Sequence, residues 1–177
     1  RLSLNPLRHI DPFGTVILPL ILAVSGAPIF GWAKPVPVVS RRMRNPVRDM
    51  MFVALAGPAT NVLLALVSAL GLAIFGAGGI VGAVLWASIS INCFLAVFNM
   101  IPLPPFDGSR VVRVLMPDAL RRRWDRLDRY ALPIFLALLV LAPMLGPKGD
   151  VIGGVIIPIV DGLRTVLLGL FGLVRVP

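Results

Sequence analysis

Long apolar stretches separated by short basic clusters make up most of the chain. The 57 residues from Met50 to Phe106 contain no Asp, Glu, Lys or Arg. A bilayer span needs about 20 apolar residues, so this interval predicts two spans, at about 50–75 and 80–101, joined by a glycine-rich turn. Further apolar stretches predict segments at about 13–33, 130–145 and 151–174. The pattern therefore predicts an all-α polytopic membrane protein of about five segments, forming a single membrane-embedded domain over residues 1–177.

The first and last of these stretches are interrupted. Pro19, Gly26 and Pro28 would weaken or kink a helix in the segment 13–33. This segment is interpreted either as a bent span or as a re-entrant element. Asp161 and Arg164 lie three residues apart in the segment 151–174, and we expect them to neutralise each other.

Composition supports the membrane class and limits the chemistry. Hydrophobic residues make up 58% of the chain and charged residues 14%, whereas soluble domains carry about 25% charged residues. These values exclude a soluble enzyme and a disordered chain. The single Cys and single His exclude an intrachain disulfide, a disulfide scaffold and a zinc site built from Cys and His.

The basic residues indicate an orientation. The loops 34–49 and 107–129 hold 12 of the 17 Lys and Arg residues, and the turn between the two central spans holds none. We expect both loops to be cytoplasmic, because basic loops stay on that side of the membrane. The net charge of +9 then needs no nucleic-acid partner.

The second basic loop contains a predicted amphipathic helix at about 118–129. Leu120, Trp124 and Leu127 share one face, and arginines occupy much of the remainder. This pattern is typical of a helix lying in the headgroup layer against anionic lipids.

A proline-rich turn follows the second central span. Pro102, Pro104 and Pro105 cannot continue a helix, so the chain leaves the span in a stiff turn that holds Asp107 at the membrane boundary. An ionisable group there is a functional candidate. The residues alone leave a second interpretation equally open, in which Asp107 is a loop carboxylate paired with Arg110 or Arg113.

The segment Asn99–Gly108, Asn-x-x-Pro-x-Pro-Pro-x-Asp-Gly, resembles the second metal motif of the site-2 protease family, the intramembrane zinc metallopeptidases. Three other segments resemble the family in the same order. These are Asn5–Thr15, the hairpin-like extended loop near residues 31–39, and Ala56–Asn61, an Ala-Gly-Pro-x-x-Asn signature. The resemblance implies cleavage of transmembrane segments of other proteins, as in regulated intramembrane proteolysis, in the inner membrane of a bacterium.

By this resemblance Asp107 would be the third protein ligand of one catalytic zinc per active site. The family supplies two His ligands and a Glu base from a His-Glu-x-x-His helix. The 177 residues contain one His and no Glu, so they cannot contain that motif. We expect it on a sixth segment upstream of Arg1, and we expect these residues alone to be inactive. The alternatives are a catalytically inactive relative acting as a membrane scaffold, or a small transporter.

Several other residues receive expected roles. Asn61 and Asn99 either form a hydrogen bond between the two central spans or support catalysis at the substrate backbone. The predicted substrate-binding residues are Lys34, Pro35, Val36 and Pro37, through strand addition, and Asn92. The residues expected to line the cavity or support it structurally are His9, Asp11, Gly57, Pro58, Pro102, Pro105 and Gly108.

Overall fold

The computed structural model describes residues 10–25, 31, 43–131, 133–135, 137 and 152–173, and all regular structure in these ranges is helical. This confirms the predicted all-α class. The chain divides into two compact units, Arg1–Arg42 and Met43–Pro177. Apart from Gly31, the predicted hairpin-like loop lies outside the described residues.

The first unit contains a π-helical turn, η2 (Pro12–Ile17), followed by α1 (Leu18–Ser25). Asp11 caps the start of η2, because its Oδ1 accepts hydrogen bonds from the backbone N–H groups of Phe13 and Gly14, both at 3.0 Å. The described helix is shorter than a membrane span, and most of the remaining predicted segment 13–33 lies outside the described residues.

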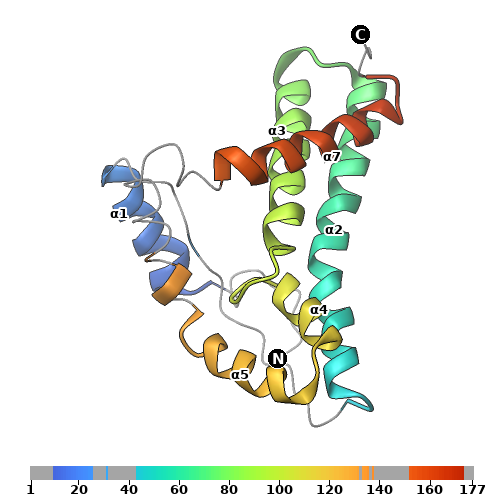
Figure 1. Cartoon of the computed structure of the whole chain (residues 1–177). Coiled ribbons are helices and arrows are strands. Elements are labelled where there is room, and N and C mark those ends of the chain that lie inside the picture. The colour runs from blue at the N-terminus through green and yellow to red at the C-terminus, as the bar shows by residue number, and fades with distance from the viewer. Residues whose placement is uncertain are drawn as a thin grey trace. The chain divides into compact units, whose positions relative to one another are not determined.

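The second unit is built on a hairpin of two long helices, α2 (Pro46–Phe75) and α3 (Gly79–Asn99) (Figure 1). Pro46 stands at the start of α2, where a missing N–H costs nothing. Gly76 ends α2 with a φ of +79°, which favours glycine. Both helices are long and apolar enough to cross a bilayer. α2 contains the predicted span 50–75, and α3 covers the predicted span 80–101 as far as Asn99.

Small side chains form the contact between α2 and α3. Ala65, Ala69 and Cys93 are fully buried, and small residues allow membrane helices to approach closely. The hydroxyl groups of Ser68 and Ser88 are 2.8 Å apart and join the helices. Cys93 is therefore part of this packed contact.

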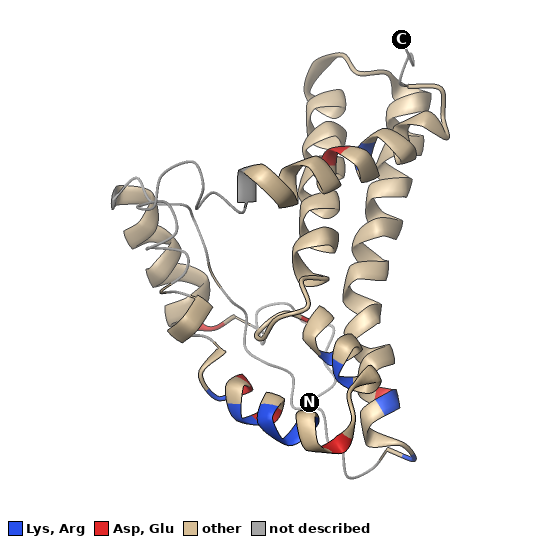
Figure 2. Ribbon diagram, in the orientation of Figure 1, with Lys and Arg blue, Asp and Glu red and all other residues tan. Residues whose placement is uncertain are grey.

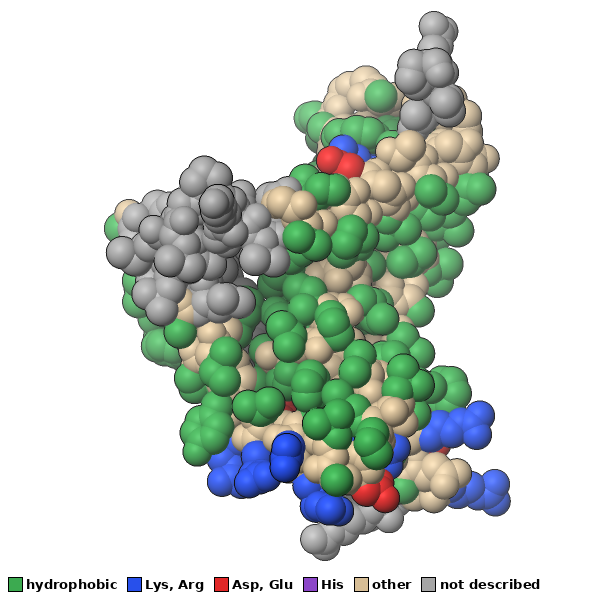
Figure 3. All heavy atoms as spheres, in the orientation of Figure 1, with side chains coloured by type: hydrophobic (Ala, Val, Ile, Leu, Met, Phe, Trp, Pro, Cys, Tyr) green, Lys and Arg blue, Asp and Glu red, His purple; other side chains and the backbone are tan. Residues whose placement is uncertain are grey.

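The outward faces of α2 and α3 remain apolar and exposed. Only 17% and 22% of the residues in their most apolar stretches are buried, and hydrophobic side chains cover much of the face seen in Figure 3. Such a surface is unfavourable in water. It is the surface expected of helices surrounded by lipid.

The last described segment packs across this hairpin. A π-helical turn, η5 (Ile152–Ile156), leads into α7 (Ile157–Gly169), which contacts both α3 and α2 (Figure 1). The 13 residues of α7 extend about 20 Å, less than the roughly 30 Å of a bilayer core. The predicted span 151–174 is therefore not a continuous α-helix of spanning length.

The expected ion pair within α7 is confirmed. Arg164 Nη2 lies 2.9 Å from Asp161 Oδ1. The guanidinium group of Arg164 also lies over the ring of Trp86 on α3, 5.7 Å from its centroid. The two charges therefore neutralise each other, and the guanidinium group packs against a neighbouring helix.

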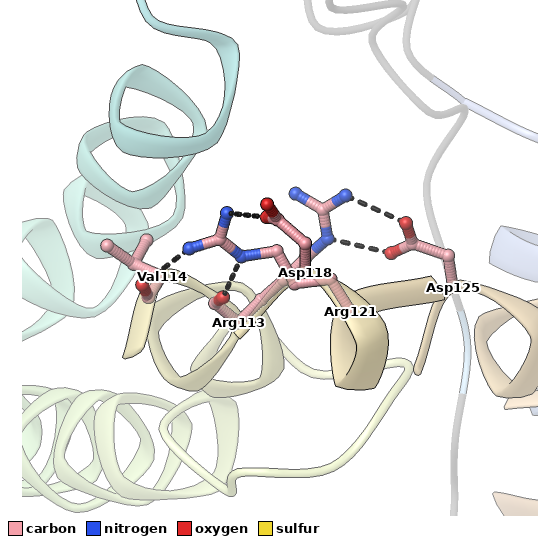
Figure 4. Close-up of polar contacts among 5 residues, drawn as sticks. All are labelled: Arg113, Val114, Asp118, Arg121 and Asp125. Atoms are coloured by element: carbon pink, nitrogen blue, oxygen red, sulfur yellow. Dashed lines mark hydrogen bonds and ion pairs between the residues drawn. The ribbon is translucent and has the colours of Figure 1, made fainter. Parts of the chain in front are cut away.

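Two short helices, α4 (Gly108–Leu115) and α5 (Asp118–Asp128), form an elbow after α3. Arg113 donates two hydrogen bonds to the carboxylate of Asp125, at 2.7 and 2.8 Å. Arg121 donates to the carbonyl oxygens of Arg113 and Val114, both at 3.0 Å (Figure 4). These bonds satisfy carbonyl groups at the end of α4 and fix the elbow.

The ion pair in the elbow stays charged at neutral pH. The hydrogen bond from Arg113 holds the pKa of Asp125 below its ordinary value. The same hydrogen bond raises the pKa of Arg113.

α5 coincides with the predicted amphipathic helix 118–129 to within one residue. Of the predicted segment 130–145, only residues 131, 133–135 and 137 are described besides Tyr130.

Candidate active site

The proline-rich turn reverses the chain between α3 and α4. α3 ends at Asn99, and α4 begins at Gly108, directly after Asp107. A Cβ atom added to Gly108 would overlap the carbonyl group of Met100 and lie 2.6 Å from the carbonyl oxygen of Ile101. Glycine therefore allows the start of α4 to pack directly on the end of α3.

Substitution of Gly108 by alanine is expected to destabilise the protein by about 1–3 kcal/mol, because the new methyl group overlaps backbone that cannot move away easily. Thermal unfolding of the purified protein measures this effect. Gly162→Ala is the control, since a Cβ atom there meets nothing within 4 Å. An unchanged Tm for Gly108→Ala would show that the turn adapts.

Aromatic contacts fix the side chain of Phe106, the residue that precedes Asp107. Its ring packs edge-on against Phe98 of α3, with centroids 4.7 Å apart, and against Phe135, with centroids 5.1 Å apart. Edge-to-face pairs of this kind favour one orientation. The aromatic cluster therefore fixes the position of the end of the turn, next to Asp107.

Asp107 faces the α2 helix. A Cβ atom added to Gly57 would lie 3.5 Å from Asp107 Oδ2, so the absent side chain leaves space for the carboxylate. Gly57 follows Asp49, the last charged residue of α2, by eight positions, or about 12 Å along a helix axis. The carboxylate therefore lies beside the apolar part of α2.

Asp107 is half-buried and, within the described residues, neither accepts a hydrogen bond nor forms an ion pair. Arg113 pairs with Asp125 instead. The structure therefore shows no ion pair between Asp107 and Arg113, whereas Arg110 attracts the Asp107 carboxylate electrostatically without forming an ion pair with it. Since burying an unpaired charge is costly, this position suits a bound cation or a proton.

An apolar cavity of about 770 Å³ adjoins the turn. It is bounded by Pro58, the residue after Gly57, and by Pro102 of the turn. Its complete lining is Leu55, Pro58, Ala59, Val62, Ala96, Val97, Met100, Ile101, Pro102, Val155, Ile156, Ile159 and Leu163. A cavity of this size and polarity accommodates apolar side chains.

The two candidate asparagines remain available for other partners. Among the described residues, the half-buried side chains of Asn61 and Asn99 form no hydrogen bond. Asn61 follows Gly57 by one helical turn, so both lie on the same side of α2. The predicted bond between the spans is made by Ser68 and Ser88 instead.

Asn92 has a structural partner. Its amide donates to the backbone carbonyl oxygen of Ser88 at 2.9 Å. It also approaches the Ser88 hydroxyl at 3.3 Å. Its assignment to the substrate stays a prediction.

The other predicted site residues fall into three groups. Two glycines lie next to Asp107, Gly57 in space and Gly108 in sequence. The adjoining cavity is lined by Pro58 and Pro102, and Pro105 lies in the same turn as Pro102. Asp11 caps the helix of the first unit. The remaining predicted residues lie outside the described part of the chain; they are His9, Lys34, Pro35, Val36 and Pro37.

Sequence reasoning missed most of the cavity lining. Val62, Ala96, Met100 and Ile159 carry no polar atom that would distinguish them from other residues of an apolar helix. The helix-breaking Pro102 beside the Asn-Met-Ile sequence was the available signal for a hollow at the end of α3.

The described residues fit part of a zinc site. They contain no group of three or more His, Cys, Asp or Glu side chains able to hold a metal. A catalytic zinc takes three protein ligands, and a carboxylate such as Asp107 is an accepted one. The described chain therefore supplies one candidate ligand.

Comparisons with known proteins identify the class. Residues 77–142 match the profile of Peptidase family M50. The chain is 33% identical over 186 residues to "Putative zinc metalloprotease YwhC" of Bacillus subtilis (strain 168), covering 100% of this chain and 78% of that protein. It is 32% identical over 146 residues to "Putative zinc metalloprotease Rip2" of Mycolicibacterium smegmatis, covering 78% and 53% of the two chains.

A third relative matches more locally. "Putative zinc metalloprotease MJ0611" of Methanocaldococcus jannaschii is 48% identical over 61 residues, which cover 34% of this chain and 32% of that protein. No solved structure matches the chain. The chain belongs to peptidase family M50, the site-2 proteases. This membership confirms the resemblance drawn from the four sequence motifs.

Proposed function

We propose that this protein is a zinc endopeptidase that cleaves transmembrane segments of other membrane proteins, as in regulated intramembrane proteolysis. The observation that carries the proposal is the position of Asp107. Its carboxylate points at Gly57 beside the apolar part of α2 and forms no hydrogen bond or ion pair within the described residues. Family membership and the names of the relatives support zinc at the level of the family.

Asp107 is assigned as one ligand of the single zinc. The two His ligands and the Glu base are proposed to come from a His-Glu-x-x-His helix outside the 177 residues, since these contain one His and no Glu. When bound, zinc would supply a water of lowered pKa for attack on a peptide carbonyl. The role of this chain is to hold the carboxylate in a rigid turn.

The substrate segment is proposed to lie between the turn and α2. The apolar cavity beside Pro58 and Pro102 suits its side chains. Asn61 and Asn99 offer amide groups to its unwound backbone, because the described residues leave both amides without a hydrogen bond. Residues 34–37 are proposed to add a further contact to the substrate by strand addition.

A multi-pass arrangement in the inner membrane of a bacterium is proposed, with loops 34–49 and 107–129 in the cytoplasm. In the second unit, the start of α2 and the α4–α5 elbow carry most of the charged residues, while the α2–α3 hairpin carries none beyond Asp49 (Figure 2). Basic residues gathered at one end support this orientation.

The decisive experiment uses the complete gene product. Metal analysis is expected to find one zinc per chain, and a membrane-embedded reporter is expected to be cleaved. A zinc chelator should stop cleavage, and added zinc should restore it. A folded protein that holds no zinc and leaves every reporter intact would instead support a non-catalytic scaffold.

A further inference from the structure

The arginines of α5 divide into two groups. Arg121 is bound by the elbow, through Asp118 and the end of α4. Arg122, Arg123 and Arg126 are exposed, and none forms an ion pair with another described residue. Three positive charges are therefore held on α5 with no protein partner in this part of the chain.

The same helix exposes apolar side chains beside these charges. Leu120 is 44% exposed and Leu127 is 49% exposed. Arg123 follows Leu120 by three positions and precedes Leu127 by four, so all three lie together on the helix surface. Arg126 continues this basic edge one turn further along.

The elbow determines which side of α5 faces outward. Asp125 and Arg121 hold α5 against α4, which occupies one flank of the helix. Arg123 and Arg126 lie on the opposite flank, since successive residues turn by about 100° around a helix. The unoccupied flank is therefore basic, and it borders the exposed leucines.

We propose that α5 lies on the membrane surface and binds the headgroups of anionic phospholipids through Arg123 and Arg126. The opposite charge of phosphate supports this occupant, and exposed Leu120 and Leu127 would enter the acyl boundary. A nucleic acid would leave these leucines in water, because its phosphate backbone offers them no apolar surface. The proposal rests on α5 and requires no proteolytic activity.

Tryptophan quenching by brominated lipids tests the proposal in the full-length protein. The 177 residues contain three Trp. Trp32→Phe with Trp86→Phe leaves Trp124 on α5 as the only one among them, and any Trp elsewhere in the full-length protein is also replaced by Phe. Vesicles contain phosphatidylcholine and phosphatidylglycerol in one fixed ratio, with bromine on the acyl chains of either lipid. Enrichment of phosphatidylglycerol at α5 makes its brominated form the stronger quencher per molecule.

In this background we compare Arg123→Gln/Arg126→Gln with Arg44→Gln/Arg48→Gln, which removes the same charge at the start of α2. A basic residue near an anionic surface contributes about fivefold in association. The preference for phosphatidylglycerol should therefore disappear in the α5 pair and persist in the α2 pair. Arg123→Lys/Arg126→Lys, which keeps the charge, should also retain it.

Three results would overturn the proposal. These are equal quenching by both lipids around the unmodified α5, no quenching by either lipid, and a preference that survives Arg123→Gln/Arg126→Gln. The first two would direct the search to a protein or nucleic-acid partner. Unchanged thermal unfolding of each variant shows that the α4–α5 elbow has remained folded.

Discussion

Replacing Asp107 with alanine in the complete protein is expected to lower zinc affinity at least about 100-fold and to abolish reporter cleavage. Changes to groups that merely orient a ligand already cost about 10–100-fold, and Asp107 is assigned as a ligand itself. No other acidic side chain within the described residues lies against Gly57, so we expect no replacement nearby. Metal analysis and cleavage are measured on the same preparation.

Two further variants separate loss of the ligand from loss of the fold. Asp107→Asn keeps the volume and removes the charge, so its thermal unfolding should match that of the parent without zinc. Asp128→Ala removes an exposed carboxylate at the end of α5 and should leave zinc and cleavage unchanged. If Asp107→Ala retains full zinc and activity, Asp107 has no place in the metal site.

Gly57 should tolerate alanine and reject leucine. An alanine Cβ would lie 3.5 Å from Asp107 Oδ2, which is ordinary contact. Alanine also favours a helix over glycine by about 1 kcal/mol. A leucine would fill the space in front of the carboxylate. Since a displacement of about 1 Å in an active site can cost 100-fold in rate, Gly57→Leu should lose at least that much cleavage activity.

The control for this series is Gly162→Leu, at a helical glycine of α7 with open space around it. Cleavage rate, zinc content and Tm are compared for all three variants. Gly57→Leu should keep a Tm near that of Gly57→Ala while losing activity. Equal cleavage by the alanine and leucine variants would show that the face of α2 at Gly57 is not part of the active site.

Asp107 could be found from the sequence because charge is scarce around it and three prolines end the preceding helix. The ranges of α2 and α3 were predictable for the same reason, since the interval between Asp49 and Asp107 is uncharged. The contact of Asp107 with Gly57 was not predictable. It joins residues fifty positions apart, and it depends on how α4 packs against α2.

Two other features depend on local structure that periodicity does not resolve. The apolar stretch 151–174 predicts one span, but Pro158 stands at the start of α7 and a π-helical turn precedes it. The arginine-rich loop predicts an amphipathic helix. Which arginines it leaves free follows from Arg113 and Arg121 being engaged across the elbow, and that pairing requires the three-dimensional arrangement.

α4 joins the elbow to Asp107 without an intervening flexible segment. Its eight residues make a rod about 12 Å long, with the carboxylate at one end and the Arg113–Asp125 pair near the other. With the proposed orientation in the membrane, the depth of the carboxylate would be set by its distance from the α4–α5 elbow and not by its distance from the middle of the bilayer. In bilayers of different thickness, the cleavage position should keep a constant distance from that elbow.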